Sequence, residues 1–158
     1  MKIRVLSDLH LESGPLQLPP ADADVVVLAG DIEPVVHGDA PRWAREQFGG
    51  CPIVWVLGNH EHYGYVDGIE RCVESARRLA AEFDVHLLEN DALVLDDVRF
   101  LGCTLWTDFR LQRMPEMSMT RARLLMSDFS GSIVIAEDGE SRYFRPQDSV
   151  HIHRKSIA

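Results

Sequence analysis

Basic residues are scarce in this sequence, which has 16 Lys and Arg against 25 Asp and Glu in 158 residues and a net charge of -9. A field of that sign repels phosphate backbones and anionic lipid surfaces. Long apolar runs are also missing, because the longest, Val25–Ala29 and Ile53–Leu57, fall far short of the ~20 residues that cross a bilayer. These absences argue against a general nucleic-acid binder and against a membrane protein.

Cysteine is rare and odd in number. Cys51, Cys72 and Cys103 lack metal-type C-x-x-C spacing, so we interpret them as buried thiols of a reducing compartment rather than as a disulfide framework. The amino terminus carries Lys2 and Arg4 where a signal peptide would need an apolar core. We therefore expect a cytoplasmic protein.

Both common phosphate-binding glycine motifs, G-x-G-x-x-G and G-x-x-x-x-G-K-[ST], are absent, which disfavours a generic nucleotide-binding α/β domain. The composition, 46% hydrophobic and 26% charged, is that of an ordinary globular domain. A chain of this length can bury one respectable core. We expect one domain, or part of one.

The first half of the chain alternates between predicted strands and helices. Continuous apolar runs within residues 3–10, 24–31 and 52–60 predict strands buried on both faces, as in a parallel sheet covered by helices. A helix is predicted over 39–48, with proline in its first turn. Another is predicted from Asp67 to Glu82, where apolar residues recur three and four apart and Asp67 forms a capping box with Glu70.

The second half is richer in short strands. The pattern predicts a strand at 85–88 and then a hairpin of strands 92–95 and 98–105. A helix at 116–126 follows, then a second hairpin of strands 133–136 and 142–145 joined by a turn at 137–140, and a last helix from 146 to 158. No glycine stops that last helix, which we interpret as interrupted. The fold class that follows is α/β.

Side chains with metal-binding atoms end each of the first three predicted strands. Asp8 and His10 lie two residues apart, so in an extended segment they leave from one face. Asp31 follows the second strand, and Asn59 and His60 follow the third. The carboxyl ends of strands in open α/β sheets form the crevice where ligands bind, so we expect these side chains at one edge.

The chemistry of these side chains suits a two-metal hydrolytic centre. A carboxylate such as Asp31 can bridge two cations, while Asp8 and the imidazole of His10 favour Mn, Fe or Zn over Ca. Two ions ~3.5–4 Å apart can hold a hydroxide and align a phosphoryl group for in-line attack. His60 could then protonate or hydrogen-bond the leaving oxygen.

Three blocks resemble the calcineurin-like metallophosphoesterase family, whose ordered blocks are D-x-H, G-D, G-N-H-[DE], a later lone His and G-H-x-H. Asp8-Leu9-His10, Gly30-Asp31 and Gly58-Asn59-His60-Glu61 match the first three in order, each after a predicted strand. The motifs cover about residues 1–64. Residues 101–109 also resemble a segment that is common in bacterial members of the family.

The resemblance implies a fold and a set of roles. The fold is a four-layer α/β/β/α sandwich with mixed sheets. Asp8, His10 and Asp31 would bind the first metal ion, Asp31 and Asn59 the second, and His60 would assist the leaving group. The implied activity is metal-dependent hydrolysis of phosphate mono- or diesters by a metal-bound hydroxide, on a phosphorylated small molecule or a phosphoprotein.

The sequence also departs from the family pattern. It contains no G-H-x-H, and His151-Ile152-His153 lacks the preceding glycine and lies in the last predicted helix. We therefore expect residues 1–158 to form a single domain truncated before the last metal-binding histidines. The second ion would keep only the shared aspartate and a neutral amide, so we expect at most one tightly held ion.

Other interpretations remain open at several positions. Asp8 could cap a following helix with His10 on the surface, and Asn59 and His60 could be ordinary turn residues. Trp106, which ends a predicted strand, could line the substrate cleft or belong to the core. We expect Glu61 to support its loop and His62 to lie at the rim of the site. The alternative function is a non-catalytic remnant that binds one metal ion or a protein partner, with self-association through uncovered sheet edges.

Overall fold

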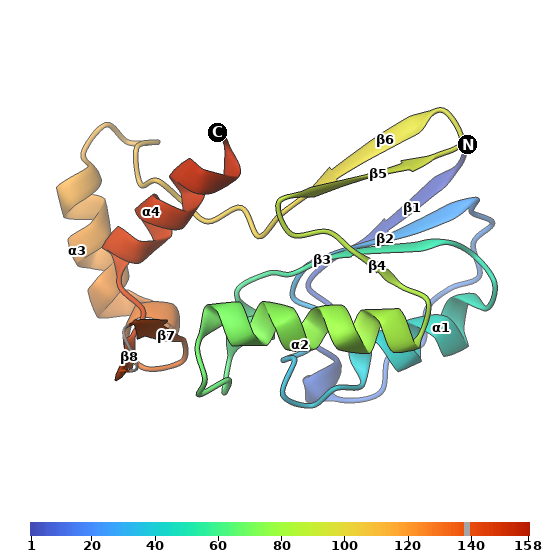
Figure 1. Cartoon of the computed structure of the whole chain (residues 1–158), viewed down its shortest axis with the longest axis horizontal. Helices are drawn as coiled ribbons and strands as arrows, with labels where there is room; N and C mark the ends of the chain where they lie inside the picture. The colour runs from blue at the N-terminus through green and yellow to red at the C-terminus, as the bar shows by residue number, and fades with distance from the viewer. Residues whose placement is uncertain (138–139) are drawn as a thin grey trace.

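A parallel sheet of four strands, in the order β1-β2-β3-β4, forms the centre of the structure (Figure 1). This computed structural model describes residues 1–137 and 140–158. The strands are β1 (Ile3–Leu6), β2 (Val25–Ala29), β3 (Ile53–Val56) and β4 (His86–Leu87). Since all four run parallel, the loops that follow β1, β2 and β3 meet at one edge. The predicted α/β class is confirmed.

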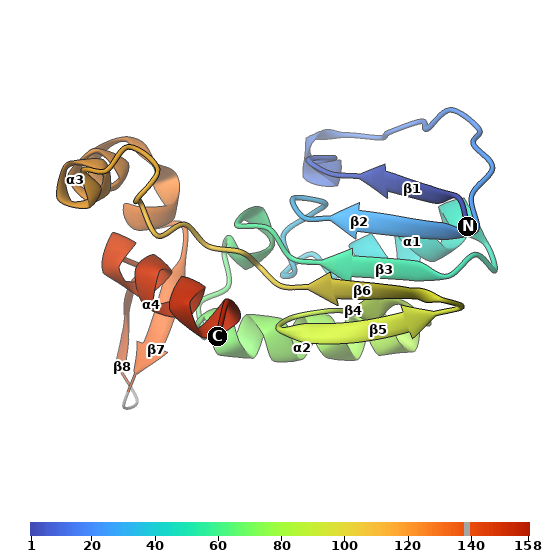
Figure 2. The same cartoon turned by 90° about the horizontal axis from the view of Figure 1, so that it is seen from above.

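Two helices cover one face of this sheet (Figures 1 and 2). They are α1 (Ala40–Phe48) and α2 (Ile69–Glu82). Leu28 and Trp55 of the sheet are each 1% exposed and pack in one cluster with Ala44 of α1 and Cys72 of α2. The small side chains on the helices let them lie close to the larger aliphatic and aromatic groups of the strands, as close packing requires.

An antiparallel hairpin covers part of the opposite face (Figure 1). It consists of β5 (Asp91–Leu95) and β6 (Val98–Gly102), and its Leu93 and Phe100 pack against the buried cluster that contains Val25 of β2 and Val54 of β3. The layers are therefore helices, parallel sheet and antiparallel hairpin, and each described sheet is purely parallel or purely antiparallel. The hairpin leaves β1 uncovered, where Val5 is 62% exposed.

The remaining elements lie beyond the carboxyl ends of β1, β2 and β3 (Figures 1 and 2). They are α3 (Pro115–Leu125), the short 3-10 helix η3 (Ser127–Phe129), β7 (Val134–Glu137), β8 (Glu140–Tyr143) and α4 (Pro146–Ser156). Phe129 and Phe144 stack at the centre of this group, with their rings 5.6 Å apart, and Ile69 of α2 joins the same cluster. The group is thereby fixed to the main sheet by α2.

Several element boundaries differ from those predicted, and two of the differences have a clear physical reason. Helix α2 begins at Ile69, not Asp67, and its N-cap is Gly68 at φ 94° with no side-chain cap. A Cβ there would lie 2.8 Å from the backbone nitrogen of Ala136, so close contact with β7 requires glycine. Strand β6 ends at Gly102, not Leu105, because Glu89 accepts hydrogen bonds from the backbone N and Oγ1 of Thr104 (2.8 and 2.7 Å) and draws the chain away.

Two further outcomes concern the hairpin turns. The two-residue turn at 96–97 between β5 and β6 is confirmed, with Asp96 at φ 49°, as such tight turns require. Strands β7 and β8 form the predicted hairpin, but they span Val134–Glu137 and Glu140–Tyr143 rather than 133–136 and 142–145, so Glu137 and Glu140 are paired strand residues. The turn itself, expected at 137–140, falls partly on residues 138–139, which lie outside the described residues.

Among the described residues, no helix has the length and apolar character that a membrane-spanning segment needs.

His62 is part of the interior, so its predicted place at the rim is wrong. Its side chain is 1% exposed, and its ring lies 5.7 Å from that of Trp106. Among the described residues, neither ring nitrogen has a hydrogen-bond partner. Burial lowers the pKa of His62 from 6.5 to about 4, because a charged imidazole loses its hydration there.

We predict that His62 makes the protein sensitive to mild acid. The unfolded chain binds a proton at His62 near pH 6.5 and the folded chain only near pH 4, so the free energy of unfolding falls as the pH drops between these values, by about 3 kcal/mol at pH 4. In His62→Phe this component should vanish from urea-unfolding curves measured from pH 7.5 to 4. The exposed His151 provides the control, since His151→Gln should retain the wild-type slope.

Candidate metal centre

Asp8 and His10 lie in a turn rather than in the extended segment that the sequence indicated. Strand β1 ends at Leu6, and Asp8 and His10 have φ values of 54° and 47°. The backbone N–H of Asp8 donates to the carbonyl of Gly30 at 3.0 Å, and that of His10 donates to the carbonyl of Asp31 at 3.1 Å. These two bonds hold the loop after β1 against the loop after β2.

Backbone strain is concentrated where these loops meet. Asp31 has φ 55°, so three adjacent site residues occupy the left-handed region that side chains other than glycine rarely adopt. Such strain persists only where the surroundings enforce it, and it is typical of functional sites. The Asp31 carboxylate is held over Gly58, since a Cβ at Gly58 would lie 2.1 Å from Asp31 Oδ1. Only glycine leaves room for that carboxylate.

Glu61 joins the loops after β2 and β3 from inside. Its side chain is 0% exposed, and its oxygens accept hydrogen bonds from the backbone N–H groups of Asp31 (2.9 Å), Ile32 (2.9 Å) and Gly58 (2.8 Å). Burial raises the pKa of the Glu61 carboxyl, and these donors oppose that rise. Its predicted role in loop structure agrees with these contacts.

Three of the predicted ligands come together. One ligand atom each from Asp8, His10 and Asp31 lies within 4.8 Å of the other two. Two carboxylates and one imidazole form a donor set that suits Mn, Fe or Zn. The residues present therefore fit a divalent transition-metal ion at this edge of the sheet.

Glu12 is a neighbour of the site that the sequence analysis missed. Its Oε1 lies 3.0 Å from His10 Nδ1 and 3.8 Å from His60 Nδ1. Although burial opposes it, hydrogen bonds from its own backbone and from His10 lower the pKa of Glu12. Because the Glu12 carboxylate contacts Nδ1 of His10, the other ring nitrogen, Nε2, is the atom left to bind an ion. The sequence feature that points to Glu12 is its spacing, because Asp8, His10 and Glu12 occupy every second position.

His60 lies beside His10, with the ring centroids 4.5 Å apart. Its ring stacks on Tyr63 at 4.3 Å, and its backbone N–H donates to Asp31 Oδ1 at 3.0 Å. Asn59 precedes it, and its Nδ2 donates to Asp128 Oδ1 at 2.7 Å. No sequence motif includes Tyr63 or Asp128, and Asp128 comes 69 residues after Asn59.

Trp106 belongs to the core and also borders a cavity. It is 8% exposed and belongs to the aromatic cluster with Phe144, at a ring distance of 4.7 Å. It also lines a cavity of about 370 Å³ together with Asn59 and Asp128. His153 Nδ1 is 2.6 Å from the Trp106 carbonyl, so this imidazole supports the loop and lies partly buried, while His151 is exposed.

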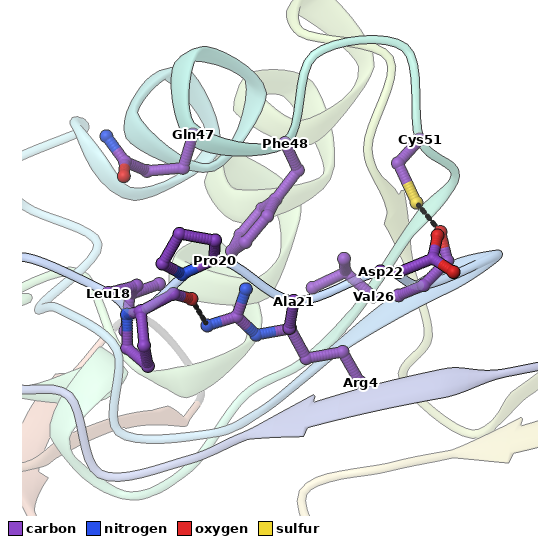
Figure 3. A pocket seen from close by; sticks show the side chains of 11 residues that line it. Arg4, Leu18, Pro20, Ala21, Asp22, Val26, Gln47, Phe48 and Cys51 are labelled. Atoms are coloured by element: carbon purple, nitrogen blue, oxygen red, sulfur yellow. Dashed lines mark hydrogen bonds between the residues drawn. The ribbon is translucent and has the colours of Figure 1, made fainter.

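A separate cavity of about 350 Å³ lies at the amino ends of the strands (Figure 3). Arg4 of β1 donates from Nη2 to the Pro19 carbonyl at 2.8 Å, and its guanidinium lies 5.7 Å from the Phe48 ring centroid. Asp8, Asp31 and Asn59 follow the opposite ends of the strands. The cavity in Figure 3 is therefore remote from the metal-binding side chains.

Comparison with known families agrees with this geometry. The model of the calcineurin-like phosphoesterases matches residues 1–102. The chain belongs to this family. A search of the curated proteins finds no match. The matched segment runs from residue 1 to the last residue of β6 and contains all four predicted metal ligands and His60.

We predict that the Glu61 carboxylate is required for stability. In Glu61→Gln at least one of the three backbone N–H groups would face an amide NH₂, and buried unsatisfied donors cost ~1–3 kcal/mol each. Chemical denaturation should show a loss of about 2–4 kcal/mol. The matched control is Glu82→Gln at the exposed end of α2, which should change stability by less than about 0.5 kcal/mol. Equal effects in both variants would contradict the assigned role.

Proposed function

We propose that this calcineurin-like phosphoesterase hydrolyses phosphate mono- or diesters with divalent metal ions held by Asp8, His10, Asp31 and Asn59. The observation that carries the proposal is the convergence of Asp8, His10 and Asp31, whose ligand atoms lie within 4.8 Å of one another on strained backbone. Strain is costly to keep at a site without a role.

The donors divide unequally between two ions. Asp8, His10 and Asp31 supply three donors to the first ion, whereas the second receives only Asp31 and the neutral amide of Asn59. We therefore propose one tightly held ion, of Mn, Fe or Zn, and one weakly held ion. Bound metal ions would supply Lewis-acid activation of water and neutralise charge on the phosphoryl group.

His60 is our proposed catalytic residue. Its side chain is 31% exposed, so substrate can reach it, and Glu12 Oε1 lies 3.8 Å from its Nδ1. The stack on Tyr63 and the contact with His10 restrain the ring. The imidazole can then donate a proton or a hydrogen bond to the leaving oxygen. Trp106, on the cavity beside Asn59, is our proposed substrate contact.

The proposed substrate is a phosphorylated small molecule or a phosphoprotein, because the net charge of -9 disfavours nucleic acids. We propose a cytoplasmic location, which the three free thiols support. We also propose that residues 1–158 act as a single domain, since Val73 of α2 packs against both the main core and the carboxyl-terminal cluster.

The alternative is a protein that binds one ion or a partner without turnover. Two observations favour it, namely the two-donor second site and the exposed apolar side chains Val5 of β1 and Leu101 of β6, which are 62% and 73% exposed. Such surfaces favour self-association along sheet edges. Activity measurements separate the two functions.

The division of donors predicts the binding stoichiometry. Calorimetric titration of the metal-free protein with Mn²⁺ should give one tight site per chain. Asp31→Ala should weaken binding at that site by at least about 100-fold, since the substitution removes one of the three donors together with its negative charge. Two equally tight sites in the wild-type protein would contradict the assignment of donors.

Hydrolysis provides the second test. The wild-type protein should cleave p-nitrophenyl phosphate or its bis ester in a Mn²⁺-stimulated reaction, and Asp31→Ala should lower kcat/KM by at least about 100-fold. Asp97→Ala, in the exposed turn after β5, should leave the rate unchanged. A pure, folded protein without metal-stimulated turnover would instead support the non-catalytic alternative.

A further inference from the structure

The short turn η3 (Ser127–Phe129) reaches the metal centre from outside the family match. The match ends at residue 102, whereas Asp128 Oδ1 accepts a hydrogen bond from Asn59 Nδ2 at 2.7 Å. Asp128 is only 4% exposed. A carboxylate buried to that degree needs a compensating partner, and the amide of Asn59 provides one.

This contact determines which way the Asn59 amide faces. A carboxylate can only accept hydrogen bonds, so Asn59 must present its NH₂ to Asp128. The same Asn59 Nδ2 also donates to the hydroxyl oxygen of Tyr63, at 3.2 Å. With both donors used on this side, the carbonyl Oδ1 of Asn59 is the atom left to bind an ion.

The turn is held firmly enough to fix that orientation. The Phe129 ring stacks on Phe144 with an interplanar angle of 17°, and the backbone N–H of Ser132 donates to the carbonyl of Ser127 at 3.1 Å. Phe129 is 6% exposed and Phe144 is 0% exposed. Asp128 is therefore carried by a rigid part of the carboxyl-terminal cluster, as precise positioning requires.

The same turn also restrains the proposed catalytic histidine. Ser127 Oγ lies 3.0 Å from the Tyr63 hydroxyl, and the Tyr63 ring stacks on His60 with an interplanar angle of 24°. Ser127 therefore contacts Tyr63, whose ring stacks on His60, while the neighbouring Asp128 accepts a hydrogen bond from Asn59.

From these contacts we propose that Asp128 is a positioning residue that aims the carbonyl oxygen of Asn59 at the weakly held second ion. The proposal rests on the proposed function, because it assumes that Asn59 binds this ion. It assigns a role in the metal centre to a segment outside the family match. Neighbours that orient metal ligands in this way typically contribute 10- to 100-fold to metal affinity or activity.

The first experiment needs no metal and tests the orientation itself. The chain has two asparagines, Asn59 and Asn90, so ¹⁵N labelling of the asparagine side chains gives two pairs of amide proton signals. The exposed Asn90 serves as the reference. We expect the Nδ2 protons of Asn59 to exchange with water at least about 10-fold more slowly than those of Asn90, and to lose that protection in Asp128→Ala. Equal exchange in the wild-type protein would overturn the proposal.

The second experiment measures the two ions separately by Mn²⁺ calorimetry extended to millimolar concentration. Asp128→Ala should weaken the second, weaker binding event by about 10- to 100-fold and leave the tight event within about twofold. Asp128→Asn keeps an acceptor oxygen for Asn59 and should restore most of the affinity. Glu116→Ala, an exposed acid on α3, should change neither event.

A double-mutant cycle separates positioning from a general structural effect. In an Asn59→Ala background, Asp128→Ala should cause no further loss of the weaker event, because its target is gone. An equal loss in both backgrounds, or a loss of the tight event as well, would overturn the proposal. If the wild-type protein binds no Mn²⁺, the proposed function fails, and the metal-free amide signals still decide whether Asp128 orients Asn59.

Discussion

The loops of the candidate metal centre depend on the buried carboxylate of Glu61, which is not one of the proposed metal ligands. Glu61 accepts backbone hydrogen bonds from Asp31, Ile32 and Gly58, so one side chain satisfies donors from the loops after two neighbouring strands. Burying that charge is tolerable only because the donors surround it. Without it, the backbone N–H groups of Asp31, Ile32 and Gly58 would lose the acceptor that ties these two loops together.

Glycine and left-handed backbone complete the arrangement that Glu61 makes possible. Gly30 and Gly58 approach so closely that a Cβ on Gly30 would lie 2.8 Å from the nitrogen of Gly58. Asp8, His10 and Asp31 adopt positive φ values around this contact. The strain in these three residues is offset by the hydrogen bonds between the loops, and it turns their side chains toward a common point.

The carboxyl-terminal cluster gives the site its second half. Asp128 and Ser127 contact Asn59 and Tyr63, and Trp106 closes over the buried His62. The aromatic stacking of Phe129 on Phe144 thus bears on the metal centre through one short turn. Packing far from the first three strands therefore affects how two of the predicted site residues are held.

The sequence by itself determined the elements and the edge at which the polar groups gather. Continuous apolar runs predict the parallel strands, and polar residues after three consecutive strands predict a shared edge, because both patterns are local. The motifs at Asp8, Asp31 and Asn59 likewise indicate the family that the match over residues 1–102 confirms. Only the tertiary structure decided the start of α2, the burial of His62, the approach of Glu12 to His60, and the contact of Asp128 with Asn59. Each of these depends on which distant segment packs against the residue, as β7 does on Gly68 and η3 on Asn59, and such long-range contacts leave no periodic trace in the sequence.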